Sequence, residues 1–356
     1  MHSINSQTSF WYTIFRGLVA AMIVSVVGDC PAAGQGTNRG VTPECQKSID
    51  RGTDWLIACM RPDGMLGPDL NQPADLSCTS IAGLALLSQG NTPLGGKNAQ
   101  ELRRIIDAVL IMVKWLPLQP REDRPITLVQ RKIGFHADRF LAALFLSQAL
   151  GDAEEADPEI RQALTKLVGE IGRAQGRDGT WGDESWAPVL GTVLGWESLR
   201  SAHSCGLEVN GSAQLAGDAL LKKLQSKLDR RETWMHDFYK DASSIRVLYS
   251  LGYKNEPAFE KCVDRTLKFA SEDDRPFTQA GGEEYLAFFL VTECMLHGNE
   301  PAWQDWYPTV SQKIMRVQNN DGSWSGHHCI VQRTFCTAAA LLTLQATQYS
   351  LPISNL

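Results

Sequence analysis

Side chains that can exchange protons or bind anions stand at the starts of several strongly apolar segments of the sequence. Carboxylates at such places can act in acid–base chemistry, whereas arginines can bind the phosphate or carboxylate of a ligand. The candidate residues for one shared site are Asp75, His136, Asp138, Arg139, Tyr239, Asp241, Glu283, Glu284, Tyr285 and Arg333. The same residue types also cap helices by pairing with one another, and a bridge between Glu284 and Arg333 is then expected.

Two kinds of helical segment alternate along the chain. In "ELRRIIDAVLIMVKWL" (residues 101–116) the apolar residues recur at the i, i+3, i+4 spacing of one helical face. In "DRFLAALFLSQAL" (residues 138–150) nearly every side is apolar, which is typical of a buried helix. The amphipathic kind lies near residues 46–60, 100–116, 159–175, 213–228, 258–270 and 304–318, and an apolar segment follows each. Strand-like alternation is nearly absent, so we expect an all-α protein.

A single pair of such helices cannot bury its own apolar surface, so successive pairs must stack. If the apolar helices form an inner ring and the amphipathic ones an outer ring, about six outer–inner pairs close into an α/α toroid. The N-termini of the inner helices then share one rim, which favours anions, and the candidate residues surround a cavity mouth. An open superhelix is the alternative, but its two helices differ less in polarity. We expect one toroid domain over residues 44–356.

A Gln-x3-Gly-x-Trp pattern occurs where two of the outer helices end. Its members are Gln175, Gly179 and Trp181 in one copy and Gln318, Gly322 and Trp324 in the other. The Asp-Gly step supplies a turn, the tryptophan a large apolar anchor, and the glutamine amide can bond backbone groups left unpaired at the helix end. We predict that each copy clamps neighbouring repeats together.

These segments carry a family resemblance. "GRAQGRDGTWG" (residues 172–182) and "MRVQNNDGSWSG" (residues 315–326) resemble the Gln-Trp repeats of the terpenoid cyclase and protein prenyltransferase superfamily, whose domains are α/α toroids. A third copy, "RGTDWLIACMRPDGML" (residues 51–66), is degenerate, with Met60 and Leu66 at the glutamine and tryptophan positions. The closing run from Arg333 is similar to exported bacterial proteins with such repeats.

The acid motifs of the superfamily are missing. Cyclases that begin by protonating an alkene or epoxide use an Asp-x-Asp-Asp or Asp-Cys-Thr-Ala-Glu motif, and this chain has no Asp-x-Asp-Asp. In "LSCTSIAGLALL", Cys78 and Thr79 match the second motif, but Ser77 stands at the position of its acid. "EDDRP" (residues 272–276) lacks the downstream aspartate of a magnesium–diphosphate site.

The resemblance also implies a test for zinc, which protein prenyltransferases hold with Asp-x-Cys on one inner helix and His on the next. Here Glu284 falls at the cysteine position and Cys336 at the histidine position, so the ligand types are rearranged. Glu284, Cys336 and His327 or His328 could still bind zinc, because carboxylate, thiolate and imidazole are all zinc ligands. The alternative is a polar loop beside a core thiol.

The ends and the charge of the chain restrict its surroundings. Arg16 precedes an uncharged run, and "PAAG" (residues 31–34) offers a cleavage site, so residues 1–34 are predicted to be an export signal and 35–43 a linker. A membrane partner is expected only if this segment stays uncleaved. The net charge of −6 without a basic stripe argues against nucleic acid as a partner.

Three functions fit these features. The chain could be a non-catalytic toroid that binds a lipid-like or anionic small molecule or another protein. It could instead be an enzyme acting on an isoprenoid or other lipid-like substrate. It could also be a carbohydrate enzyme on an (α/α)6 barrel, with Glu283 or Asp241 in acid–base roles. A wide apolar cavity with a buried carboxylate favours an enzyme, and an interior filled by side chains favours a scaffold.

Overall fold

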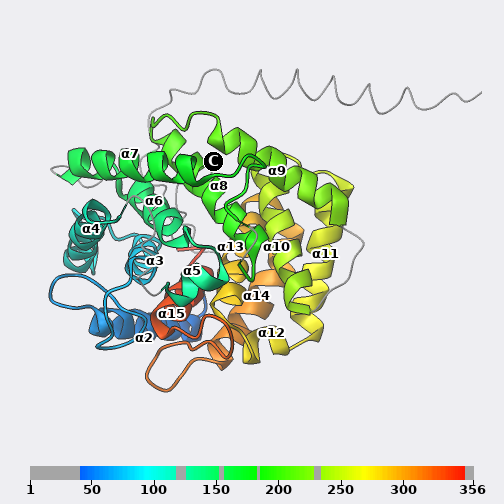
Figure 1. Ribbon diagram of the computed structural model, residues 1–356. Helices are drawn as coiled ribbons and strands as arrows, with labels where there is room; N and C mark the ends of the chain where they lie inside the picture. Colours follow the sequence, from blue (N-terminus) through cyan, green and yellow to red (C-terminus); the bar gives the residue numbers. More distant parts are fainter. Residues whose placement is uncertain (1–40, 118–125, 152–155, 183–184, 228–233, 349–356) are drawn as a thin grey trace, which may run out of the picture. The chain divides into compact units, whose positions relative to one another are not determined.

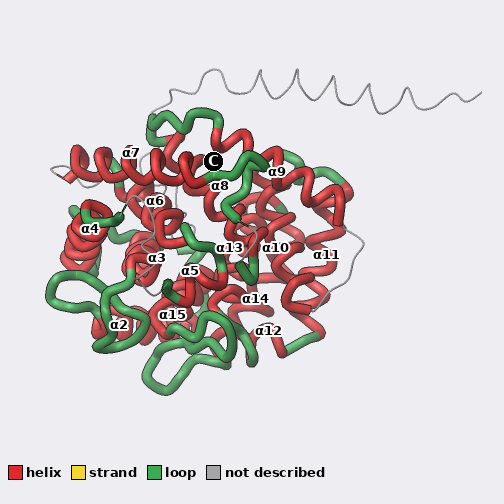
Figure 2. The backbone as a smooth tube through the Cα atoms, in the orientation of Figure 1, coloured by secondary structure: helices red, strands yellow, loops and turns green. Residues whose placement is uncertain are grey.

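The alternating segments of the sequence form alternating helices (Figure 1). In this computed structural model the chain divides into residues 1–32 and 33–356. The structure describes residues 41–117, 126–151, 156–182, 185–227 and 234–348, all in the second part. The predicted export signal and most of the predicted linker lie outside them. Figure 2 shows helices joined by loops, and no strand occurs in the described ranges.

Six amphipathic helices form an outer layer. They are α2 (Pro43–Cys59), α4 (Ala99–Lys114), α7 (Asp157–Ala174), α9 (Ser212–Lys227), α11 (Pro257–Glu272) and α14 (Glu300–Arg316). Each contacts an inner helix, and α4, for example, buries Leu102, Ile105, Ile106, Ala108, Val109 and Val113 on one face. The opposite faces meet solvent, as expected from the hydrophobic periodicity.

Six helices, most of them apolar, form the inner layer. They are α3 (Leu76–Leu87), α6 (Ala137–Ala149), α8 (Pro188–Ser204), α10 (Trp234–Ser250), α13 (Gly282–Gly298) and α15 (Arg333–Leu344). Each contacts the next in this order, and α15 contacts α3, so the ring is closed. The predicted all-α toroid of six outer–inner pairs is therefore confirmed, and closure excludes the open superhelix. Two short helices, α5 (Leu128–Lys132) and α12 (Arg275–Thr278), lie in the connections.

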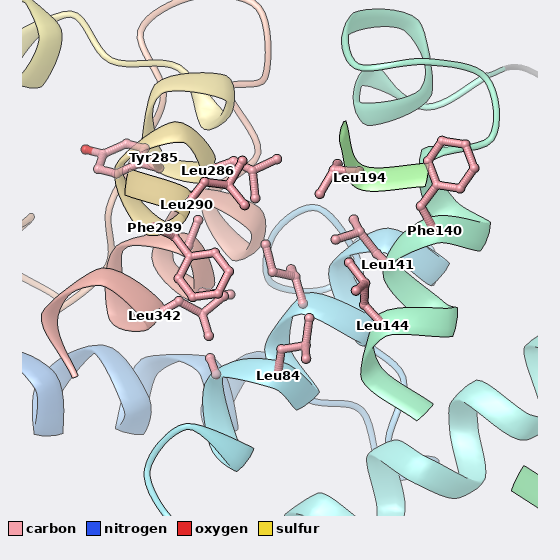
Figure 3. Packing of buried hydrophobic residues seen from close by; sticks show 14 of the residues in the cluster. Leu84, Phe140, Leu141, Leu144, Leu194, Tyr285, Leu286, Phe289, Leu290 and Leu342 are labelled. Carbon is pink, nitrogen blue, oxygen red and sulfur yellow. The ribbon is translucent and has the colours of Figure 1, made fainter. Parts of the chain in front are cut away.

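Apolar side chains fill the space that the inner ring encloses. Figure 3 shows side chains from α3, α6, α8, α13 and α15 directed toward one another, including those of Leu84, Leu141, Leu144, Leu194, Leu286, Phe289, Leu290 and Leu342. An open chamber on the axis would leave such side chains accessible to water. Phe289, the most accessible of the labelled residues, is only 9% exposed, so water reaches little of this interior.

One buried charge network joins three successive inner helices. Arg246 on α10 donates from Nε to Glu197 Oε1 on α8 at 2.9 Å and from Nη1 to Glu293 Oε2 on α13 at 3.0 Å. Ser250 also donates to Glu197 Oε1, at 3.0 Å. All three charged side chains are buried, and pairing is what makes such burial tolerable.

The two Gln-x3-Gly-x-Trp segments have the same geometry. Gln318 donates from Nε2 to the carbonyl oxygens of Gly322, at 2.8 Å, and of Ser48 on α2, at 2.9 Å. Gln175 makes the equivalent pair, to Gly179 at 3.1 Å and to the first residue of α9 at 2.9 Å. Each glutamine thus joins its own turn to the next outer helix.

The glycines of these turns adopt a conformation that other residues avoid. Gly179 has φ +86° and Gly322 has φ +96°, in the left-handed region. A Cβ at Gly322 would lie 2.5 Å from the carbonyl oxygen of Arg51 on α2, and one at Gly179 would lie 2.3 Å from that of Leu215 on α9. Both conformation and space therefore require glycine at the point where the turn meets the neighbouring helix.

The two tryptophans are buried in the wall between the layers. Trp181 is 6% and Trp324 0% exposed. Trp181 Nε1 donates to Ile171 O at 2.8 Å, and Trp324 Nε1 donates to Ile314 O at 2.9 Å, each ten residues earlier in the chain. The ring of Trp324 also packs against α2 at Gly52, where an added Cβ would come within 2.7 Å of it.

Replacement of Trp324 tests this role in stability. We expect Trp324→Ala to lower the free energy of unfolding by about 3–5 kcal/mol, because it removes a fully buried aromatic ring. Trp115, which is 76% exposed, provides the control, and Trp115→Ala should change the free energy by less than about 0.5 kcal/mol. Denaturant titration measures both values, and equal losses in the two variants would contradict the predicted clamp.

Candidate functional site

Arg139 is held within the protein by acidic partners. It donates from Nε to Glu170 Oε2 on α7 at 3.0 Å and pairs with Asp138 Oδ1 at 3.2 Å. Its Nη2 donates to Pro117 O at 2.9 Å, and the residue is 3% exposed. Burial raises the pKa of Asp138, although Arg139 acts in the opposite direction. The charge of the Arg139 guanidinium is thus already neutralised within the protein, although the sequence suggested that this residue would contact an anionic ligand.

Arg333 also has acidic partners, but not the one that was expected. Arg333 pairs with Asp321 and, at 3.5 Å, with Asp69, and its guanidinium lies 4.7 Å from the ring centre of Trp55. Among the described residues it does not pair with Glu284, so the expected Glu284–Arg333 bridge is wrong. The reason is that Arg333 begins α15 next to the turn containing Asp321, which offers a nearer carboxylate.

Asp241 on α10 likewise forms an ion pair, with an arginine on an outer helix. Arg265 on α11 donates from Nε to Asp241 Oδ2 at 2.8 Å, and its Nη2 contacts the other oxygen. This pair joins an inner helix to its outer partner.

Asp75 and His136 lie at the starts of α3 and α6. Asp75 Oδ1 accepts a hydrogen bond from the amide of Cys78 at 3.0 Å and so caps α3, while its buried Oδ2 has no described partner. Burial raises the pKa of Asp75. Burial, with a contribution from Arg139, lowers the pKa of His136 to about 4, and its ring packs edge-on against Phe135. His136 is therefore neutral at physiological pH.

The beginning of α13 carries two fully buried carboxyl groups. Glu284 accepts hydrogen bonds from the Tyr239 hydroxyl and, at 2.6 Å, from the amide of Gly281. Glu283 accepts one from the amide of Ile330 at 3.3 Å, while its Oε1 is buried without a described partner. Burial raises the pKa of Glu283 to about 6 and that of Glu284 to about 8. A carboxyl group that keeps its proton near neutral pH is suited to acid chemistry.

The loop before α15 covers this carboxyl pair. His328 Nε2 lies 3.5 Å from Glu284 Oε2, without hydrogen-bond geometry. Cys329 has φ +52°, which is uncommon for a residue with a side chain. Burial, followed by the charge of the nearby Glu283, raises the pKa of Cys329 to about 11. We call Tyr239, Glu283, Glu284, His328 and Cys329 the α13 cluster.

The predicted zinc ligands are not all brought together. Glu284 and His328 are neighbours, but His327 is exposed and the Cys336 thiol donates to Ile330 O at 3.5 Å. Burial, followed by the nearby Glu283 and Glu284, raises the pKa of Cys336, which disfavours the thiolate that zinc requires. Within the described ranges, no three His, Cys, Asp or Glu side chains are placed to hold a metal ion. In this arrangement the predicted ligands do not converge on one metal position.

Tyr285 belongs to the core rather than to the cluster. It is 1% exposed and packs edge-on against Phe288, with ring centres 6.2 Å apart. Figure 3 shows its hydroxyl directed away from the side chains of Leu286 and Leu290.

Lys132, which lies near the α13 cluster, and Cys329, which belongs to it, were not anticipated. Lys132 lowers the pKa of both Glu283 and Cys329 through its charge, and it lies 5.2 Å from the ring centre of Trp186. It ends α5, a helix that was not expected although its capping box, formed by Thr127 and Gln130, is a readable sequence signature. The backbone conformation of Cys329 has no such signature.

All eight described cysteines are free thiols, and most are buried. No helix within the described ranges is long and apolar enough to cross a membrane.

Comparison with known proteins supports the fold. No family model matches this sequence, and no curated protein matches it. A variant of the type II terpene cyclase MstE from Scytonema, solved without ligand, superposes with a TM-score of 0.52 at 13% identity, covering 85% of this chain and 97% of that one. A variant of MstE in complex with its substrate, geranylgeranyl dihydroxybenzoate, superposes with a TM-score of 0.50 at 13% identity, over 86% and 97% of the two chains. The expected resemblance to terpenoid cyclases is thus confirmed at the level of the fold, since this chain shares the α/α toroid of MstE.

Proposed function

We propose that this protein is a non-catalytic toroid that acts as a binding or scaffold protein, exported as the character of residues 1–34 suggests. The observation that supports the proposal is the burial of the side chains that face the axis of the inner ring. Ligand pockets for lipid-sized molecules take up roughly 300–1,000 Å³. Side chains as little exposed as Leu290 (3%) and Phe289 (9%) do not border a chamber of that size.

The pairing of charges at the inner-helix starts supports the same conclusion. Arg139 is neutralised by Asp138 and Glu170, and Arg333 by Asp321 and Asp69. A guanidinium that already holds two carboxylates contributes little to binding a phosphate. The role of these residues is thus to connect inner helices with outer helices and turns.

An enzyme acting on an isoprenoid is the second candidate, and the α13 cluster is what favours it. Glu284 is a buried carboxyl that keeps its proton near neutral pH, as an acid that protonates an alkene must. Its partners, however, are the Tyr239 hydroxyl and the Gly281 amide, and the residue is fully buried. A carbohydrate enzyme fits less well, because Glu283 and Glu284 are consecutive and Asp241 is paired with Arg265.

Hydrophobic ligands test whether the interior is filled. We expect the wild-type protein to bind neither geranylgeraniol nor benzene, and Phe289→Ala to bind benzene, because it opens an apolar cavity at the centre of the ring. Isothermal titration calorimetry with each ligand measures this, and the benzene signal of the variant shows that binding inside the ring is detectable.

Two results would refute the proposal. One is saturable binding of geranylgeraniol to the wild type with a Kd below about 10 μM. The other is cyclisation of geranylgeranyl dihydroxybenzoate, seen as a new chromatographic product of unchanged mass. The second result would establish the enzyme instead.

The proton on Glu284 predicts a pH dependence of stability. Because its pKa is raised to about 8 in the folded state, the folded protein binds this proton more tightly than the unfolded chain. Stability should therefore fall as the pH rises from about 5 to about 8, by roughly 1 kcal/mol per pH unit from this group. Glu284→Gln should flatten that slope in denaturant titrations, whereas Glu260→Gln, at an exposed site on α11, should preserve it. Equal slopes in all three proteins would show that Glu284 is ionised throughout.

A further inference from the structure

A second place on the molecule has the features of a binding site. A cavity of about 190 Å³ lies between α2 and the loop of residues 88–98, which connects α3 to α4. Its walls include exposed residues such as Asp50 and Lys97, so the cavity reaches the surface. It is separate from the α13 cluster, with which it shares no residue.

One wall is a set of amide side chains that hold one another in place. Asn91 is 4% exposed and donates from Nδ2 to Leu86 O at 2.9 Å and to Gln89 Oε1 at 3.3 Å. Asn98, 6% exposed, donates to the same Gln89 oxygen at 3.3 Å, and Gln89 donates to the Thr53 hydroxyl on α2. A network of this kind is rigid and presents its polar groups in fixed directions.

The backbone around this wall is equally constrained. The amide of Asn98 donates to Asn91 Oδ1 at 2.9 Å, which draws the two ends of the loop together. Thr92 and Gly95 form a reciprocal backbone bridge, at 2.8 and 3.3 Å. Gly96 lies so close that an added Cβ would be 2.6 Å from Asn91 Oδ1. The polar wall is therefore preorganised before any ligand arrives.

The facing wall comes from both ends of the described chain. Gln46 on α2 donates from Nε2 to Asp50 Oδ1 at 2.9 Å, and Gln348, after α15, donates to Gln46 Oε1. Asp50 Oδ2 and Gln348 Oε1 have no hydrogen bond to any residue that the structure describes. Lys97 is likewise without a described partner, so donors and acceptors both remain for a ligand.

The composition of the walls indicates the chemical class of that ligand. Amides offer donors and acceptors side by side, as hydroxyl groups do. One carboxylate, Asp50, and one ammonium group, Lys97, balance each other, which disfavours a strongly charged ligand. Ile49 is the only large apolar side chain among the lining residues, which disfavours a lipid. Since liquid water occupies about 30 Å³ per molecule, the volume matches roughly six waters, or one sugar ring.

We propose that this cavity is a binding site for a small neutral polyhydroxyl molecule, a monosaccharide or polyol. The inference goes beyond the scaffold role and does not rest on it, because the cavity lies outside the inner ring. The hydroxyl groups of the ligand would replace water on Asp50 Oδ2, Gln348 Oε1 and the Lys97 ammonium group. Gln46 helps to position Asp50 and Gln348 through its hydrogen bonds with them.

Ligand-observed NMR on the purified full chain tests this, with glucose, mannitol, glucuronate and glucosamine as probes. We expect at least one neutral probe to bind saturably with a Kd in the millimolar range or tighter. Gln46→Leu should weaken that binding by at least tenfold. The matched control is Gln214→Leu, because Gln214 donates to Asp218 on α9 at 2.9 Å in the same i, i+4 arrangement but away from the cavity.

Three outcomes would overturn the inference. In the first, neither glucose nor mannitol binds saturably. In the second, only glucuronate or glucosamine binds. In the third, the Gln46→Leu and Gln214→Leu proteins bind the neutral probe with equal affinity. None of them bears on the hydrophobic-ligand experiment, so the two proposals can fail separately. Circular dichroism of each variant confirms that it is folded.

Discussion

Contact between α15 and α3 closes the inner ring and holds the other helices in place. The two helices meet although more than 240 residues separate them in the chain. Gln345, at the end of α15, donates from its side chain to Ala85 O at 2.6 Å and to the Ser88 hydroxyl. Once the ring is closed, every inner helix has a neighbour on each side, an outer layer behind and other inner helices across the axis. This is why all twelve residues of α3 are buried.

The same constraint explains where polar groups can lie. Inside the ring they must satisfy one another, as Arg246 does with Glu197 and Glu293. At the helix ends, loops can supply partners, and both sites described above lie there. The α13 cluster is closed over by the loop before α15, whereas the amide-lined cavity beside α2 reaches the surface. The polar features therefore lie at the rim of an apolar centre.

Much of the fold could be predicted from the sequence, because helix type and order follow from local periodicity. The Gln-x3-Gly-x-Trp segments were also readable, since glycine and tryptophan at fixed spacing have few structural uses. The partner of Arg139 could not be predicted in this way. Its long side chain reaches Glu170 on an outer helix, and which carboxylate it reaches depends on how the helices pack. The amide-lined cavity was missed for a related reason. Its walls come from near Gln46, Gln89 and Gln348, which only ring closure brings together.

The central claim is that the inner ring holds side chains rather than a lipid. Native mass spectrometry of the protein purified from its own host tests this most directly, because a bound lipid would survive as an adduct of defined mass. The account predicts a single species with the mass of the polypeptide alone, with no adduct that organic extraction removes. A stoichiometric lipid adduct, lost on unfolding, would contradict it.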